Sequence, residues 1–369
     1  MKRILAAALC AVLLLPGFAR AETKTGTDVP AEAAYLIEAN SGRVLYAKNE
    51  NAHLPMASTT KIMTALLAIE SGRMQETVTV PDEAIGTEGS SMNLKTGETL
   101  RFEDLVYGLM LTSGNDAAVA IAVLLAGSTA AFADRMNERA AKMGLFDTHF
   151  VTPNGLHDPN HYTSARDLAL LGAAALSDPA FREIVSTQYR KTEGSNQHTL
   201  KNKNKLLWEY EGGIGVKTGY TKKAGKCLVF AAERGGMMLV GAILNCPTMW
   251  STAKSMLDAG FREYRTKQFL SADTVFSLPV ENGVKKTLSA APIRGILYPT
   301  EVDGDERFSL ETSFEQGIRA PVMKGQTLGT ATLLRNGEAV ASAPIAAAET
   351  VDAVDFGFFF RKAVLAFVG

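Results

Sequence analysis

The sequence predicts an α/β chain of the α+β kind, in which helices cluster beside an antiparallel sheet, followed by a small all-β domain. The length of 369 residues exceeds what one hydrophobic core usually holds. Up to about Thr266, apolar runs with helical spacing occur together with β-rich runs, whereas short alternating strands and turns follow. Hydrophobic residues make up 46% and charged residues 21%, which excludes disordered, collagen-like and polytopic membrane proteins.

Residues 1–21 are expected to form a signal peptide. Lys2 and Arg3 precede the apolar run Ile4–Leu15, and Ala19–Ala21 has the small-x-small pattern of a cleavage site. The apolar run is shorter than the roughly 20 residues that span a bilayer. We therefore expect cleavage after Ala21 and export to the outer face of the cytoplasmic membrane, in a periplasm or a cell wall.

The first domain, residues 22–265, is expected to open with a β-hairpin over Ala34–Ala47. A second hairpin is predicted from the β-rich runs Lys226–Ala232 and Met237–Leu244 around a Gly-Gly turn. Because the two hairpins lie at opposite ends of the domain, we expect their strands to share one antiparallel sheet. Helical periodicity predicts helices over Ile62–Glu70, Leu105–Leu111, Asp116–Leu125, Phe132–Met143, Ala165–Leu176 and Thr252–Tyr264.

Residues 266–350 are expected to form a β-sandwich-like domain, with strands at Thr274–Leu278, Gly295–Tyr298 and Thr327–Leu334. Residues 351–369 are expected to form an amphipathic tail. One helical face of this tail carries Phe356, Phe359, Phe360, Ala363 and Phe367. Such a helix suits the interface of a membrane surface, although docking on its own β domain is the alternative.

Charge, cysteines and histidines give no sign of nucleic acid, disulfide bonds or a metal. There are 38 basic and 39 acidic residues, so no basic excess exists to hold nucleic acid. Cys227 and Cys246 lie in or beside apolar runs and are expected to be buried free thiols. The five histidines are scattered and read as structural or surface residues, so we expect neither a metal nor a cofactor.

Three short motifs stand in order along the first domain. Ser58–Lys61 opens the first predicted helix, Ser113–Asn115 separates two helices, and Lys217–Gly219 is expected to begin the first strand of the late hairpin. Each motif alone is weak, because Ser-x-x-Lys and Ser-Gly-Asn occur in ordinary helix turns and loops. All three, in this order and on these elements, predict one catalytic site.

The first motif has the spacing that serine activation needs. Residues three apart on a helix share a face, so the Ser58 hydroxyl and the Lys61 amine can meet. The N-terminus of a helix disfavours an ammonium group, and Lys217 nearby lowers the pKa of Lys61 further. A neutral Lys61 then acts as general base for Ser58 as nucleophile on an acyl carbon.

The second motif suits proton relay and the orientation of the reacting groups. Ser113 is expected to relay a proton to the leaving group, and Asn115 to orient Lys61 and the substrate amide.

The third motif is expected to hold the substrate. Lys217 and Thr218 offer a charge and a hydroxyl to a terminal carboxylate, and Gly219 lets the substrate backbone approach the strand. The backbone N–H groups of Ser58 and Tyr220 are the expected oxyanion donors.

The chain resembles the low-molecular-mass penicillin-binding proteins that act as serine-type D-alanyl-D-alanine carboxypeptidases. The resemblance extends from about Ala33 to the end. It rests on eight segments similar to the family's opening hairpin, nucleophile helix, second motif, two segments that follow the active-site helices, Asn-x-Asn-x-Leu-Leu-Trp segment, third motif and C-terminal domain. In that order they are Leu36–Tyr46, Met56–Thr64, Leu111–Ala118, Thr148–Leu156, Tyr162–Ala169, Asn202–Trp208, Gly215–Thr221 and Ala320–Gly329.

This resemblance implies a penicillin-binding, β-lactamase-like transpeptidase fold and a serine acyl-transfer cycle on peptidoglycan stem peptides that end in D-Ala-D-Ala. Ser58 would expel the terminal D-alanine, and water would hydrolyse the acyl-enzyme. β-Lactam antibiotics would acylate the same serine. Two positions depart from some members: Tyr220 replaces a histidine, and Lys203 in the substrate-binding segment replaces an arginine, so it offers a point charge without a bidentate fork.

Three alternatives remain open at this stage. A β-lactamase shares the motifs, but the chain shows no convincing Glu-x-x-x-Asn segment between the second and third motifs, and it has the extra β domain. An endopeptidase or transpeptidase acting on cross-links shares all three motifs. A non-catalytic cell-wall-binding module would not need Ser58, Lys61, Ser113 and Lys217 all intact.

Overall fold

The computed structural model describes residues 29–354, 357–360 and 364. The predicted signal peptide, residues 1–21, and most of the predicted tail lie outside these residues. The chain divides into two compact units between Arg265 and Thr266, and each is described by itself.

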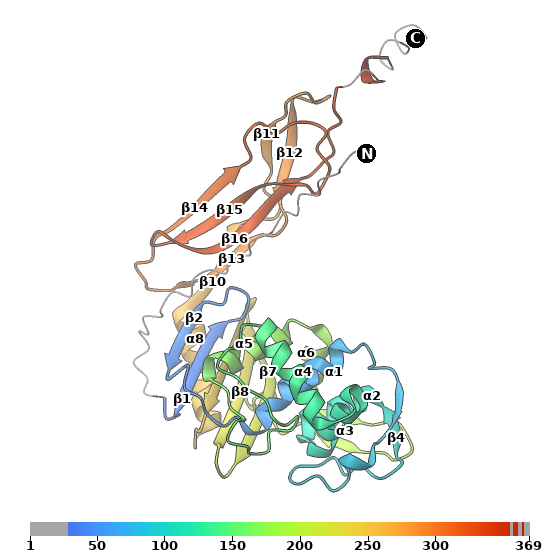
Figure 1. The fold of residues 1–369 in the computed structure, drawn as a ribbon. Coiled ribbons are helices and arrows are strands. Elements are labelled where there is room, and N and C mark those ends of the chain that lie inside the picture. The colour runs from blue at the N-terminus through green and yellow to red at the C-terminus, as the bar shows by residue number, and fades with distance from the viewer. Residues whose placement is uncertain (1–28, 355–356, 361–363, 365–369) are drawn as a thin grey trace. The chain divides into compact units, whose positions relative to one another are not determined.

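The first unit is built on a five-stranded antiparallel sheet (Figure 1). Its strands, in spatial order, are β2 (Val44–Lys48), β1 (Ala33–Glu38), β9 (Met237–Leu244), β8 (Gly225–Arg234) and β7 (Gly213–Thr221). The first hairpin, β1–β2, pairs directly with the late hairpin, β8–β9, through β1 and β9. This confirms the expectation that strands from both ends of the unit share one sheet. β1 and β9 are buried along their whole length, which suits strands that are covered on both faces.

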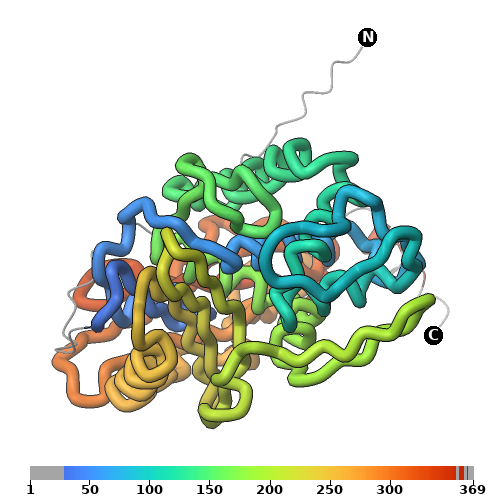
Figure 2. Tube along the Cα trace, turned by 90° about the horizontal axis from the view of Figure 1, so that it is seen from below, coloured from blue at the N-terminus to red at the C-terminus, as the bar shows by residue number. Residues whose placement is uncertain are grey.

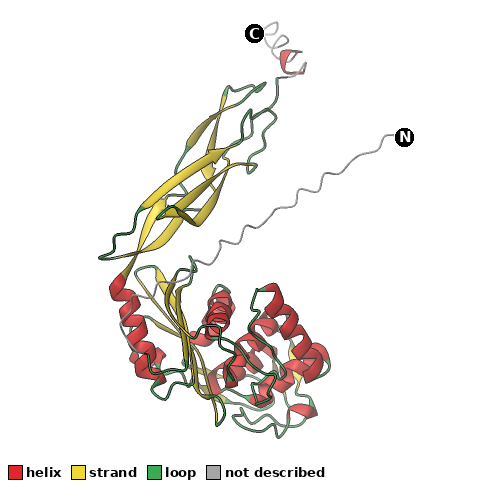
Figure 3. Cartoon of the chain, turned by 60° about the vertical axis from the view of Figure 1, so that its left-hand side comes forward, coloured by secondary structure: helices red, strands yellow, loops and turns green. Residues whose placement is uncertain are grey.

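Helices cover both faces of this sheet (Figure 3). On one face α8 (Met249–Glu263) packs on β8 and β9 around a core that includes Phe230, Leu239 and Leu257. On the other face lie α5 (Ala165–Leu176) and five further helices, around a larger core. These are α1 (Lys61–Glu70), α2 (Phe102–Tyr107), α3 (Asn115–Ala126), α4 (Thr129–Lys142) and α6 (Pro179–Ser186).

The helix ends follow from local capping residues. Ser164 is the N-cap of α5, and its hydroxyl accepts a hydrogen bond from the Asp167 N–H at 3.1 Å. Asp178 caps α6, whose first residue is Pro179; this helix was not among the predicted ones. The predicted helix over Thr252–Tyr264 ends at Glu263, because Tyr264 already has extended backbone and begins a strand.

Two short antiparallel strand pairs complete the helical side. They are β3 (Thr77–Thr79) with β4 (Thr99–Arg101), and β5 (Tyr189–Lys191) with β6 (Thr199–Lys201). Figure 2 shows the segment of β5 and β6, in yellow-green, reaching the segment of β4, in cyan, where Gly194 forms a bridge with Leu100. The Ser195 hydroxyl accepts a hydrogen bond from the Thr99 N–H there at 2.9 Å. A one-turn helix, α7 (Leu206–Glu209), then leads to β7.

The cysteines lie on opposite faces of the sheet. Cys227 belongs to the core beneath α5, and Cys246 to the core beneath α8. Both are buried and free, which confirms the expectation of unpaired thiols.

The second unit consists of strands, turns and loops up to residue 354, so the predicted fold class of the chain is confirmed. A five-stranded antiparallel sheet has the order β11 (Phe276–Pro279), β12 (Thr287–Pro292), β16 (Glu338–Ala347), β15 (Thr327–Arg335) and β14 (Phe308–Phe314). A separate pair consists of β10 (Tyr264–Leu270) and β13 (Ile296–Glu301). Asn336 and Gly337 both have positive φ and join β15 to β16, as an Asn-Gly hairpin turn requires.

The tail face is described only in part. Phe359 and Phe360 belong to the helical residues 357–360 and are exposed, whereas Phe356, Ala363 and Phe367 lie outside the described residues. Among the described helices, none alone is both long and apolar enough to cross a membrane; α3 and α4 reach that threshold only together, across an 83° bend.

Candidate active site

Ser58 lies in a tight turn that immediately precedes α1. Residues Ala57–Thr60 form one turn of 3₁₀-helix, and the α-helix begins at Lys61. The sequence placed Ser58 at the start of the α-helix itself; the tighter turn arises because the Thr59 and Thr60 hydroxyls donate to the carbonyls of Met56 and Ala57. Ser58 is partly exposed at the end of a buried helix.

Lys61 is fully buried and hydrogen-bonded to three groups of the site. Its Nζ donates to Ser58 Oγ at 2.9 Å, to Asn115 Oδ1 at 2.6 Å and to the Asn154 carbonyl at 2.6 Å. Burial, and then the charges of Lys217 and Lys203, hold the pKa of Lys61 well below its usual range. The expectation that Lys217 depresses this pKa is therefore confirmed. When it is neutral, the amine has two N–H donors, which serve Asn115 and Asn154, and its lone pair can accept the Ser58 proton across the 2.9 Å contact. This is the geometry of a general base.

The second motif is held by a sharp change of backbone direction. After α2 the chain continues as a π-helical turn, Gly108–Thr112, which ends at Ser113 with φ of 64°. Asn115 then begins α3, and its Nδ2 donates to the Glu88 carbonyl at 2.5 Å. Ser113 and Asn115 are both buried, and Asn115 is the member of this motif that contacts Lys61.

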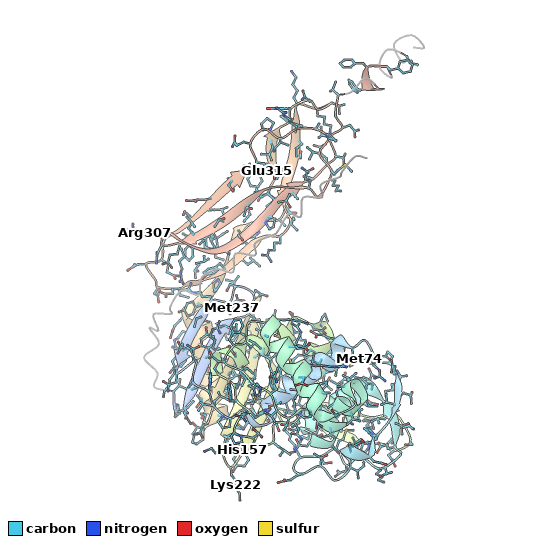
Figure 4. All side chains as sticks on the ribbon, viewed as in Figure 1. Met74, His157, Lys222, Met237, Arg307 and Glu315 are labelled. Atoms are coloured by element: carbon cyan, nitrogen blue, oxygen red, sulfur yellow. The ribbon has the colours of Figure 1, made fainter. Side chains whose placement is uncertain are left out.

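The third motif lies within β7, the edge strand of the sheet, and does not begin the late hairpin as predicted. The sequence alone did not separate β7 from the hairpin formed by β8 and β9. Figure 4 marks Lys222 in the turn that follows β7.

Lys217 is buried, with 2% of its surface exposed, and its Nζ donates to the Thr218 carbonyl at 3.0 Å. Burial and the charge of Lys203 lower the pKa of Lys217 to about 7. Among the residues that the structure describes, no carboxylate pairs with this amine, so a substrate carboxylate is a suitable partner.

Gly219 brings β7 against the Ser58 turn. A Cβ atom at this position would lie 2.9 Å from the Met56 carbonyl oxygen and 3.1 Å from the Ser58 nitrogen, too close for any side chain. Only glycine therefore allows β7 this close to the backbone of the nucleophile. The next residue, Tyr220, has a side chain that is 65% exposed.

Lys203 approaches the second motif from the segment after β6. Its backbone N–H donates to the Leu111 carbonyl at 3.1 Å, and its Nζ lies 3.4 Å from Ser90 Oγ. The residue as a whole is exposed, yet partial burial of the amine lowers its pKa. The site therefore gathers three lysines, of which Lys61 and Lys217 are buried.

Sequence reasoning missed one wall of the site, the segment that holds Asn154. We gave the segment Thr148–Leu156 no role, although Asn154-Gly155 is a recognisable turn signal. Gly155 has φ of +85°, and a Cβ atom there would lie 2.0 Å from the Ala57 carbonyl oxygen. This close approach carries the Asn154 carbonyl to Lys61. Within the described residues no group of three or more His, Cys, Asp or Glu side chains is placed to hold a metal ion.

Comparison with known proteins gives two family matches. Residues 19–248 match the model described as D-alanyl-D-alanine carboxypeptidase, and residues 264–353 match the model described as the C-terminal domain of penicillin-binding protein 5. D-alanyl-D-alanine carboxypeptidase DacF of Bacillus subtilis is 34% identical, over 98% of each chain.

Two solved structures are similar as well. Penicillin-binding protein 5 from Haemophilus influenzae has a TM-score of 0.75 at 30% identity, covering 89% of this chain and 99% of that one. A mutant of the Streptomyces K15 DD-transpeptidase has a TM-score of 0.61 at 31% identity, covering 64% of this chain and 99% of that one. The chain belongs to the D-alanyl-D-alanine carboxypeptidase family of serine peptidases.

Proposed function

We propose that this protein removes the terminal D-alanine from peptidoglycan stem peptides through an acyl-enzyme on Ser58. The observation that carries the proposal is the contact between Lys61 Nζ and Ser58 Oγ at 2.9 Å, made by a buried amine whose pKa is lowered. Family membership supports the same reaction class.

In this mechanism Lys61 takes the Ser58 proton as Oγ attacks the carbonyl carbon between the two D-alanines. The N–H groups of Ser58 and Tyr220 stabilise the oxyanion, which the close approach of Gly219 to the Ser58 nitrogen supports. Ser113 relays a proton to the departing D-alanine nitrogen. Water then hydrolyses the ester and frees Ser58.

The substrate is selected by two lysine cations and by the edge of strand β7. Lys217, Thr218 and Lys203 receive the terminal carboxylate, while Gly219 leaves room for the peptide backbone along the strand. Asn115 keeps the Lys61 amine in place and faces the substrate amide. β-Lactams enter as mimics of the dipeptide and acylate Ser58.

The decisive experiment compares the wild-type protein with Ser58→Ala. We expect a fluorescent penicillin to label the wild type and D-alanine to be released from a Lys-D-Ala-D-Ala tripeptide, and both signals to vanish in the variant. Labelling without release would favour endopeptidase or transpeptidase action; the similar Streptomyces K15 protein is named a DD-transpeptidase. A folded wild-type protein that is never labelled would leave a non-catalytic wall-binding module.

The site of action is proposed to be outside the cytoplasmic membrane. The signal-peptide pattern of residues 1–21 supports export, and the amphipathic pattern of residues 351–369 supports attachment to the membrane surface. If a chain that ends near Thr350 floats with lipid vesicles as well as the full-length protein does, the tail is not the attachment.

A further inference from the structure

His161 is buried, and both of its ring nitrogens have hydrogen-bond partners. Nδ1 accepts from the backbone N–H groups of Val151, at 2.9 Å, and Thr152, at 3.3 Å. Nε2 lies 2.7 Å from Thr60 Oγ1. Because Nδ1 faces two N–H donors, the neutral ring carries its proton on Nε2 and donates it to Thr60. Burial lowers the pKa of His161 to about 4, in agreement with a neutral ring.

The hydrogen bond from His161 continues through Thr60 to the residue before the nucleophile. Having accepted from Nε2, Thr60 Oγ1 donates to the Ala57 carbonyl oxygen at 2.9 Å. Ala57 has φ of +48°, a left-handed conformation that a residue with a side chain rarely adopts. The hydrogen bonds from His161 through Thr60 therefore stabilise a backbone conformation at Ala57 that the residue would not adopt by its own preference.

The Ala57 carbonyl and the Ser58 N–H belong to the same peptide group. A trans peptide is planar, and its C=O and N–H point in opposite directions. Holding the Ala57 oxygen therefore also fixes the direction of the Ser58 N–H, which is one of the two proposed oxyanion donors.

The other ring nitrogen connects to the opposite wall of the site. Val151 and Thr152 lead into Asn154, whose carbonyl accepts from Lys61 Nζ at 2.6 Å. His161 thus links the nucleophile turn with the segment that holds the general base.

We propose that His161 is a positioning residue that acts through Thr60 to direct the Ser58 N–H at the oxyanion. It exchanges no proton with the substrate. This inference rests on the acyl-enzyme function proposed above. It assigns a role to His161, which lies outside the three motifs, and to Thr60, which lies between Ser58 and Lys61 in the first motif.

The test compares Thr60→Val with its matched control, Thr60→Ser. Valine keeps the shape of the side chain but removes the hydroxyl from the chain of hydrogen bonds, whereas serine keeps the hydroxyl. We expect Thr60→Val to slow acylation by a fluorescent penicillin about tenfold to hundredfold, and Thr60→Ser to stay within about threefold of the wild type. Labelling at saturation should reach the same fraction of folded chains in all three proteins.

The inference is overturned if Thr60→Val and Thr60→Ser are acylated at equal rates per folded chain, or if Thr60→Val lowers only the labelled fraction at saturation. If the folded wild type is not labelled at all, the acyl-enzyme function is wrong, and the inference about His161 is wrong with it. A second pair covers the case in which Thr60→Val does not fold. His161→Gln places an N–H donor near the position of Nε2, whereas His161→Asn places its amide near Nδ1, so the glutamine variant should be acylated faster. The reverse order would overturn the inference.

Discussion

The Ser58 turn and strand β7 form two sides of one site, yet their polar groups are held very differently. Lys61 Nζ has three protein partners within hydrogen-bond distance, and its neighbours Thr59 and Thr60 hold the turn with further hydrogen bonds. Lys217, which is also buried, donates within the described part of the chain to one acceptor, the carbonyl of the next residue in its own strand. The turn is organised before any ligand arrives, whereas β7 keeps its donors for a ligand.

This difference separates chemistry from recognition. A general base must be held at a fixed distance from its serine in the free protein, and a buried, hydrogen-bonded lysine meets that need. A carboxylate receptor must stay unsatisfied until substrate binds, because its hydrogen bonds should be made with the substrate. Changes on the turn should therefore reduce the rate of acylation, and changes on β7 should mainly weaken binding.

The largest effect is expected for Lys61→Met, which removes the base and keeps an unbranched side chain in the buried site. Acylation by penicillin should slow by on the order of 10⁴-fold, because no neighbouring group replaces the amine. Stopped-flow labelling of the folded variant measures this rate. A loss smaller than about tenfold would show that another group accepts the Ser58 proton.

Lys217→Gln should act on binding first. It removes a charge from the carboxylate site, and KM for the tripeptide should rise about tenfold to hundredfold with a smaller change in kcat. Because one cation near Lys61 is lost, the pKa of Lys61 should rise, and the acid limb of the kcat profile should shift to higher pH. Steady-state kinetics across pH measure both effects. An unchanged KM would show that another residue, Lys203 first among the candidates, binds the substrate carboxylate.

The pH dependence of KM should report Lys217 in the unmodified protein. The pKa of Lys217 is lowered to about 7 in the free site, and a bound carboxylate favours the charged amine. Substrate binding above that pH must therefore take up a proton, so KM should rise toward tenfold per pH unit between about pH 7 and 9 and stay level below pH 7. Calorimetric titrations in two buffers of different ionisation enthalpy would detect the proton uptake. A flat KM over this range would contradict the assignment.

Tyr220→Ala should have the smallest effect. The proposed oxyanion donor is the backbone N–H of residue 220, and the tyrosine side chain is 65% exposed. Both kcat and KM should stay within about threefold of the wild-type values, as for a surface substitution. A larger change in KM alone would give the tyrosine ring a contact with the substrate.

The elements with strong local signals were predictable from the sequence. The two hairpins of the sheet, the helices α1, α3, α4 and α5, and the Asn336-Gly337 turn follow from periodicity and turn chemistry. Helix α6 and strands β3 to β6 were missed because they are short, and tertiary contacts stabilise them more than their own composition does. Strand β7 was merged with the following hairpin, because β-rich residues continue across both.

The pairing of Ser58 with Lys61 was determined by sequence alone, since residues three positions apart on a helical turn must share a face. The ordered motifs likewise indicated the chemistry and the family before any coordinates. Tertiary structure decided what surrounds them: the Asn154 carbonyl on Lys61 and His161 on Thr60 join residues 93 and 101 positions apart. No local pattern encodes such contacts, because they form only when separate segments pack together. The same packing buries Lys217 and thereby lowers its pKa.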